Sequence, residues 1–238
     1  MQGVESRDWY YNEFRHVGLD YNSAEEVETY EEEFGENTDR SDEIEELVDI
    51  LELDATKSVL DIGTATGSLA LELAKLCKQV YAIDISEPML VCARKKAERF
   101  GLDNIEFSHA GFLSYQLKDN TLDAVFSKYA FHHLPDIWKF VALKRIFASL
   151  KPGGRFFLKD AVLSVDIHEF YDFADDWVST MDELFGDKGT EAAVLYFKEE
   201  YPTYVWVIEE MLKRVGFNVV EVSSAPEPHT AFICTKPS

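Results

Sequence analysis

One short stretch, residues 59–67 with the sequence V-L-D-I-G-T-A-T-G, constrains the fold of this chain more than any other. The apolar run 58–62 predicts a strand buried on both faces, and an amphipathic helix follows the turn. Gly63 and Gly67 lack the Cβ atoms that would hold a ligand away from the backbone at the start of this helix. The stretch therefore predicts a strand–turn–helix unit with a ligand bound closely at its turn.

A second apolar run, 80–85, carries one acid, Asp84, near its C-terminal end. In open α/β sheets a carboxylate at this place commonly binds the two hydroxyls of a ribose. The spacing at the first turn differs from the dinucleotide pattern G-x-G-x-x-G, and Asp61 stands two residues before the turn. That carboxylate would repel a pyrophosphate but would accept a hydrogen bond from an ammonium group. The pattern favours a nucleoside compound over a dinucleotide.

Strands and helices alternate through the middle of the chain, which predicts a parallel sheet with helices on both faces. The strands are expected near 58–62, 79–84, 104–108, 121–127 and 154–160, with helices near 67–77, 88–100 and 137–150. After Asp160 the pattern changes to an acidic, aromatic helix, a glycine break, a second helix and two strands. These are expected at 166–186, 186–189, 203–215, 217–222 and 231–235.

Four further motifs follow the turn in order, and together they resemble the class I S-adenosylmethionine-dependent methyltransferases. They are Asp84, the strand 121–127 (T-L-D-A-V-F-S), the segment 131–136 (F-H-H-L-P-D) and the segment 150–155 (L-K-P-G-G-R). Within that family the chain is similar to the small-molecule methyltransferases of the ubiquinone and menaquinone biosynthesis type. The resemblance implies a Rossmann-like, doubly wound α/β fold. Its seven-stranded sheet would be mostly parallel with an antiparallel C-terminal strand, preceded by an N-terminal helical cap. It also implies that the protein is an enzyme with S-adenosyl-L-methionine as its cofactor.

The resemblance assigns a set of cofactor-binding residues. They are Asp61, Gly63, Thr64, Ala65, Gly67, Asp84, Ile85, Met89, Gly111, Phe112, Ser127 and Tyr21. Two positions depart from the family pattern. Ala65 replaces the middle glycine of the turn. Gly111 and Phe112 stand where relatives often carry an acid and a small residue, and that acid usually holds the adenine amino group. The backbone N–H of Phe112 remains available for a ring nitrogen of the adenine.

The net charge of −22 is unevenly distributed, with −16 in residues 1–54, +3 in 58–160 and −10 in 161–238. Acidic surfaces repel nucleic acid phosphates, so nucleic acid is not an expected partner. The three cysteines have no C-x-x-C spacing, and no metal site is expected. The sequence contains neither a long apolar run nor a leader pattern at its first residues, so it predicts a cytoplasmic protein without a membrane partner.

The chain is expected to consist of a cap and a catalytic domain. Residues 1–40 are both aromatic and acidic and would form the cap, and 41–238 would form the cofactor-binding methyltransferase domain with a helical lid insertion at 161–200. Aromatic residues of the cap and of the lid are candidates for the acceptor pocket. The candidates are Tyr10, Tyr11, Phe14, Tyr129, Phe170, Trp177 and Tyr204.

Methyl transfer from a sulfonium is an in-line displacement with a good leaving group, so alignment and water exclusion suffice and a general base is optional. His132 and His133 are candidate bases because imidazole titrates near neutral pH, and Asp160 is a candidate for orienting the acceptor. The acidic flanks suggest a small-molecule acceptor that is cationic or carries an amine.

Three other functions compete with this interpretation. The protein could hold S-adenosylmethionine or S-adenosylhomocysteine without turnover, or it could methylate a basic segment of another protein. A nicotinamide-dependent oxidoreductase is disfavoured by Asp61 and by the spacing of the turn. Neither the acceptor nor the oligomeric state follows from the sequence.

Overall fold

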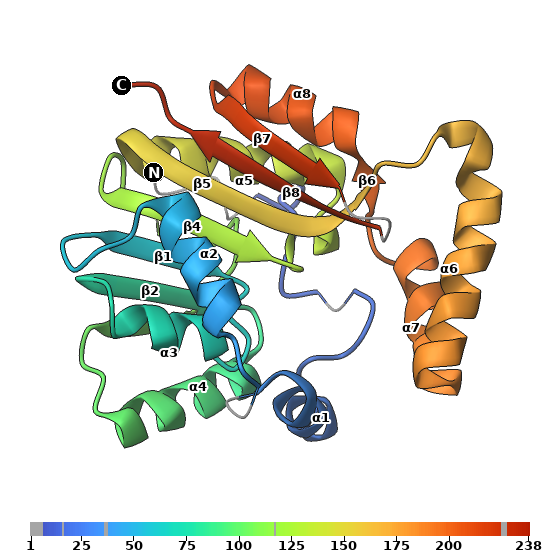
Figure 1. The fold of residues 1–238 in the computed structure, drawn as a ribbon, viewed down its shortest axis with the longest axis horizontal. Helices are drawn as coiled ribbons and strands as arrows, with labels where there is room; N and C mark the ends of the chain where they lie inside the picture. Colours follow the sequence, from blue (N-terminus) through green and yellow to red (C-terminus); the bar gives the residue numbers. More distant parts are fainter. Residues whose placement is uncertain (1–6, 16, 36–37, 117, 225–227) are drawn as a thin grey trace.

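The computed structural model describes residues 7–15, 17–35, 38–116, 118–224 and 228–238. Its centre is a twisted sheet in the order β3-β2-β1-β4-β5-β8-β7, with a short additional strand, β6, paired to β5 (Figure 1). The strands are β1 (Ser58–Ile62), β2 (Gln79–Asp84), β3 (Ile105–His109), β4 (Leu122–Lys128), β5 (Leu150–Leu163), β6 (Thr203–Tyr204), β7 (Asn218–Ser224) and β8 (His229–Thr235). β8 runs antiparallel to both β5 and β7, whereas β1 to β5 pair in parallel. The expected doubly wound α/β fold is confirmed.

Helices cover both faces of the sheet, and each face has its own apolar core. The helices are α1 (Ala24–Phe34), α2 (Ser41–Leu51), α3 (Ser68–Ala74), α4 (Glu87–Phe100), α5 (Asp136–Ser149), α6 (Phe170–Phe185), α7 (Asp187–Lys198) and α8 (Val205–Val215), with 3₁₀ turns η1 (Phe131–His133) and η2 (Ile167–Glu169). Helices α2 and α3 pack over one face, and α5 and α8 pack over the other (Figure 1). Phe126 and Val125 of β4 are fully buried, one in each core, because successive side chains of a strand point to opposite faces.

The long helix expected at 166–186 is shorter and is followed at once by a second helix that the sequence did not suggest. Only Gly186 breaks the pattern, with a φ of 64°, and α7 begins at the next residue. Gly189 lies inside α7, where a Cβ atom would stand 2.2 Å from the carbonyl oxygen of Met181. The glycine therefore lets α6 and α7 pack closely as a hairpin beyond the carboxyl ends of the parallel strands (Figure 1).

The strand expected at 154–160 is also longer, because β5 starts at Leu150 and continues to Leu163. Its pairing with β4 shifts register between Leu122 and Ala124, and residues 155–161 of β5 pair on the other side with β8. In the described part of the chain, no helix combines the length and apolar character needed to cross a membrane.

Candidate functional site

A cavity of about 960 Å³ opens at the carboxyl ends of the parallel strands, where ligands bind in open α/β sheets. Three parts of the chain line it: the segment before α2, the strand ends with their following loops, and the face of α6 that looks toward the sheet. The volume lies at the upper end of the roughly 300–1,000 Å³ found for small-molecule sites.

The turn after β1 forms one wall of the cavity. Gly63 has a φ of 82°, and a Cβ atom on it would lie 2.5 Å from the Cβ of Ala130, so this position requires glycine. Ala65 also adopts a left-handed conformation, with a φ of 49°, although it is not glycine. Its N–H donates to Asp84 Oδ2 at 2.8 Å. This bond ties the turn to the end of β2.

Asp84 lies at the end of β2 with each carboxylate oxygen held by one backbone N–H. Ala65 donates to Oδ2, and Ser86 donates to Oδ1 at 2.8 Å. Each oxygen of a carboxylate can accept more than one hydrogen bond, so both can still accept from a diol. Burial raises the pKa of Asp84, which the two backbone hydrogen bonds partly offset.

Asp61 is a buried carboxylate that faces the cavity with only 3 % of its surface exposed. Burial raises its pKa to about 7, although the nearby Thr64 side chain lowers it, and the negative charge of Asp84 raises it further. A cationic group arriving in the cavity would stabilise the ionised form. The position therefore fits an ammonium group.

Glu13, from the segment before α1, fills the place where the sequence lacks an acid. Its carboxylate accepts hydrogen bonds from the N–H groups of Leu113 at 2.9 Å and Ser114 at 2.7 Å, and it is 7 % exposed. A Cβ atom on Gly111 would lie 2.6 Å from Glu13 Oε2. The carboxylate of Glu13 thus lies where an acidic side chain at position 111 would place its own carboxylate, and the absence of a side chain at Gly111 makes room for it. The sequence did not indicate Glu13, because it lies in the N-terminal segment, far from the strand ends that carry the motifs.

Basic side chains gather in the cavity at the ends of β4 and β5. Lys128 and Lys159 are register partners in these neighbouring strands, and both line the cavity together with Arg40. Glu43 pairs with Arg40 at 2.7 Å and also with Lys128. Within the described residues Lys159 forms no ion pair, so three cations face one carboxylate in this part of the cavity.

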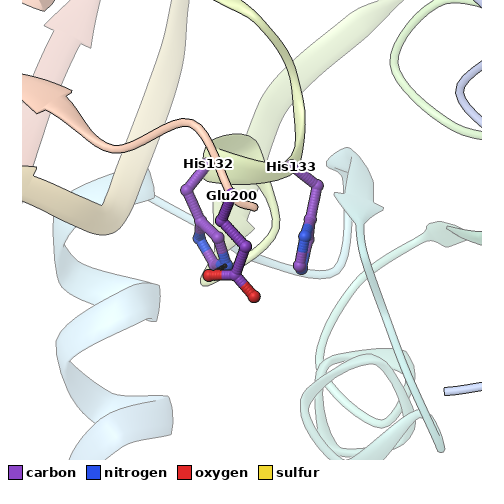
Figure 2. A group of neighbouring side chains, drawn as sticks. All are labelled: His132, His133 and Glu200. Atoms are coloured by element: carbon purple, nitrogen blue, oxygen red, sulfur yellow. Dashed lines mark ion pairs between the residues drawn. The ribbon is translucent and has the colours of Figure 1, made fainter. Parts of the chain in front are cut away.

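The two candidate histidines lie on η1, directly behind the cavity wall. His133 lines the cavity, and His132 Nδ1 lies 2.7 Å from Asp160 Oδ1. Asp160 is fully buried and also accepts the backbone N–H groups of Ala130, Phe131 and His132. Figure 2 shows the carboxylate of Glu200 beside the ring of His132, and the centroids of the two imidazole rings are 4.2 Å apart. Glu200 is a second site residue that the sequence did not indicate.

The negative charge of Asp160 shifts the titration of this group. It raises the pKa of His132 despite the burial of the ring, and the nearby carboxylate of Glu200 acts in the same direction. In return, the His132 side chain and the backbone donors hold the pKa of Asp160 at about 2, against the effect of its burial. Asp160 is therefore ionised and engaged inside the protein.

Most of the residues assigned to the cofactor lie on one wall of the cavity. The lining includes Tyr21, Asp61, Gly63, Thr64, Ala65, Asp84, Ile85, Met89, Gly111 and Phe112. Gly67 and Ser127 lie outside it. Gly67 begins α3, where a Cβ atom would stand 2.9 Å from the Cβ of Ala93, and the buried Ser127 Oγ donates to the carbonyl of Ile62 at 2.8 Å. These two residues do not face the cavity; Gly67 allows α3 to pack closely on α4, and Ser127 holds β4 to the end of β1.

The aromatic residues expected in the acceptor pocket divide into two groups. Phe14, Tyr129 and Trp177 line the cavity. Tyr10 and Tyr11 instead pack against Trp138, Phe170 packs against Phe197, and Tyr204 ends β6 outside the cavity. His132 and Asp160 also lie outside the lining. Several lining residues were not predicted: Arg40, Lys128, Lys159, Met181, Leu184, Phe185 and His229.

Comparison with known proteins identifies relatives of this chain. Residues 59–154 match the family described as methyltransferase domain. An uncharacterized methyltransferase of Geobacillus kaustophilus is 32 % identical over 173 residues, which are 65 % of this chain and 77 % of the relative. Another, from a Geobacillus species, is 31 % identical over 202 residues, 77 % of this chain and 89 % of the relative.

Solved structures share the fold at lower identity. An S-adenosylmethionine-dependent methyltransferase from Aquifex aeolicus superposes with a TM-score of 0.62 at 21 % identity, covering 91 % of this chain and 98 % of that one. Phosphoethanolamine N-methyltransferase 2 of Haemonchus contortus, in complex with phosphomonomethylethanolamine and S-adenosylhomocysteine, superposes with a TM-score of 0.70 at 19 % identity. That match covers 92 % of this chain and 61 % of the other.

Proposed function

This chain belongs to the class I S-adenosylmethionine-dependent methyltransferases, and we propose that it methylates a small molecule that carries an anionic group. The observation that carries the proposal is the division of the cavity. One wall holds the carboxylates Asp61 and Asp84. The other part holds Arg40, Lys128 and Lys159, with Glu43 as the one carboxylate that pairs with them among the described residues.

The residues of the first wall fit S-adenosylmethionine, which supplies a methyl group activated on a sulfonium. The buried Asp61 carboxylate would hold the ammonium group, and the free lone pairs of Asp84 would accept the ribose hydroxyls. The absence of a Cβ atom lets Ala130 approach the turn at Gly63 and lets Glu13 approach the loop at Gly111, which sets the shape of this wall. Phe112 N–H has no acceptor among the described residues and would donate to the adenine ring. Glu13 would accept a hydrogen bond from the adenine amino group.

The second part of the cavity supports an anionic acceptor. Among the described residues, three basic side chains against Glu43 leave an excess of positive charge, of which the carboxylate of the methyl donor can balance one. Burial and the nearby charges of Lys159 and Arg40 lower the pKa of Lys128 to about 8, which is still high enough to keep it mostly charged at neutral pH. The remaining charge favours a phosphate or carboxylate on the acceptor. The acidic flanks of the sequence favour a cationic acceptor instead. Salt screens these exposed charges over distance, whereas the cations inside the cavity would contact the acceptor directly, so they should determine which acceptor binds.

The reaction requires the acceptor atom and the methyl group to be aligned and kept dry. Trp177, Met181 and Leu184 of α6 close the cavity on the side away from the sheet and would exclude water. His133 is the candidate base that lines the cavity, and its contribution depends on whether the acceptor atom carries a proton at neutral pH.

An acceptor screen tests the proposal. Calorimetric titration with S-adenosylhomocysteine would first establish cofactor binding. Methyl transfer would then be measured with size-matched sets of anionic, neutral and cationic amines and phenols. Turnover limited to the anionic members supports the proposal, and turnover of only neutral or cationic members contradicts it. Cofactor binding without any turnover would support a non-catalytic binding module.

Methylation of a basic protein segment is the second candidate function, suggested by the acidic surface. Basic peptides are included in the same screen for this reason. The excess of cations inside the cavity disfavours them. We also propose a cytoplasmic location, which the three unpaired cysteines support.

A further inference from the structure

We propose that His132, His133 and Glu200 form a binding site for a divalent metal ion of the zinc type. The three residues come from two parts of the chain that meet behind the cavity. The histidines are consecutive on η1 after β4, and Glu200 follows α7. The backbone N–H of Tyr201 donates to the carbonyl of His132 at 2.9 Å and fixes the two parts together.

The geometry of the three side chains supports the proposal. One ligand atom from each residue lies within 4.8 Å of the others. His132 Nε2 and Glu200 Oε2 are 3.5 Å apart, which is longer than the roughly 2.7–2.9 Å of a charge-assisted hydrogen bond. Two ligands that each lie about 2.1 Å from a tetrahedral metal are separated by about 3.4 Å. The observed separation thus fits a pair of metal ligands better than an ion pair in direct contact.

The chemistry of the donor set also fits. Two imidazoles and one glutamate are a recurring set of protein ligands for zinc, and such a set leaves a fourth position open. With Nδ1–H donated to Asp160, the neutral His132 ring has its lone pair on Nε2, the atom that faces Glu200, and a metal would displace the Nε2 proton of the charged ring. A buried carboxylate that orients a metal-binding histidine in this way is a typical outer-shell partner. Asp160 is itself held rigidly by backbone donors of η1.

A metal at this site would link the α6–α7 hairpin to the sheet. Glu200 lies where the α6–α7 hairpin rejoins the sheet, and α6 lines the cavity with Trp177 and Met181. A metal that joins Glu200 to η1 would fasten the base of this hairpin to the end of β4. It would also reach the cavity wall through His133, whose metal-bound nitrogen could then not act as the base of methyl transfer.

Zinc titration tests the proposal without any methyl donor, so its failure would leave the proposed methyl transfer unaffected. Untagged protein, freed of metal by a chelator, would be titrated with zinc chloride by calorimetry. The matched variants are Glu200→Gln and Glu199→Gln, which remove the same charge at a ligand and at its exposed neighbour. We expect one equivalent of zinc to bind to the wild type and to Glu199→Gln, and at least tenfold weaker binding to Glu200→Gln.

Two further measurements guard against misfolding and against adventitious binding. Thermal unfolding followed by circular dichroism shows whether each variant folds, and His133→Gln replaces Glu200→Gln in the comparison if the latter does not fold. Cobalt(II) bound to the wild type should show the strong visible absorption of four-coordinate cobalt. Absence of zinc binding by the wild type, equal binding by the ligand variants, or the weak spectrum of six-coordinate cobalt would overturn the proposal.

Discussion

Replacing Glu13 by glutamine should change which base the cofactor site accepts. In the structure Glu13 Oε1 takes the N–H of Ser114 at 2.7 Å, and Oε2 lies beside Gly111 at the cavity. The amide oxygen of glutamine, placed at Oε1, can keep the bond to Ser114 and the longer bond, 3.1 Å, to the N–H of Leu113, whereas the 2.9 Å bond from Leu113 to Oε2 is lost. The amide nitrogen would then stand at the position of Oε2, where a donor replaces an acceptor. The variant should therefore stay folded but lose the acceptor for the adenine amino group.

The size of the effect follows from the loss of one hydrogen bond to a charged group, about 1.5–3 kcal/mol. Since about 1.4 kcal/mol corresponds to a factor of ten, S-adenosylhomocysteine should bind roughly 10- to 100-fold more weakly. The analogue in which hypoxanthine replaces adenine presents a carbonyl oxygen instead of the amino group. The wild-type carboxylate should repel this oxygen, and the amide of the variant should donate to it.

Calorimetry with both ligands on both proteins measures the change. The preference for adenine over hypoxanthine should fall at least tenfold in Glu13→Gln, and it should be unchanged in Glu32→Gln, an exposed glutamate of α1 that serves as the control. An unchanged preference in Glu13→Gln, whatever its overall affinity, would refute the assignment of Glu13 to the adenine.

Three other changes have expected outcomes. Because burial raises the pKa of Asp61 to about 7, an ammonium-bearing cofactor must displace a proton below that pH. The affinity for S-adenosylhomocysteine should thus fall about tenfold per pH unit below 7 and level off above it, and Asp61→Asn should flatten this dependence in calorimetry. Lys159→Ala should raise the KM for the acceptor and leave the dissociation constant of S-adenosylhomocysteine nearly unchanged. The control Lys144→Ala, at an exposed lysine, should change neither constant. An equal loss of cofactor affinity in Lys159→Ala would show that Lys159 binds the methyl donor instead. Phe126→Ala should lower the free energy of unfolding, measured by urea denaturation, by about 3–5 kcal/mol, because the fully buried ring would leave a cavity in the core. A decrease below about 1 kcal/mol would contradict the packing described.

The parts of the fold with regular hydrophobic spacing were predictable from the sequence. The bounds expected for the first strand, 58–62, are those of β1, because a buried strand followed by a glycine turn leaves a clear local pattern. Helix α7 was not predicted, since Gly186 and Gly189 together resemble a loop although only Gly186 ends a helix.

The site could be predicted only where its residues belong to the motifs. Glu13 and Glu200 reach it from outside those motifs, and Glu13 bonds to a residue one hundred positions away. Local propensity and spacing contain no information on such a pairing, because it depends on where the folded chain brings the segment. The same holds for Lys128 and Lys159, which become neighbours only through the register of β4 and β5.

The docking of Glu13 on the loop after β3 also bears on how the cofactor enters and leaves. The segment that carries Glu13 is synthesised about one hundred residues before Leu113 and Ser114. It can therefore bind to the loop after β3 only once the sheet has brought that loop into place. The described residues 7–15 form no helix or strand and pair with no strand of the sheet, so we expect this segment to detach while the strands stay paired. Each detachment exposes the amides of Leu113 and Ser114 to solvent. Hydrogen exchange at these two amides would therefore report how often Glu13 detaches, and a cofactor bound against Glu13 should slow this exchange.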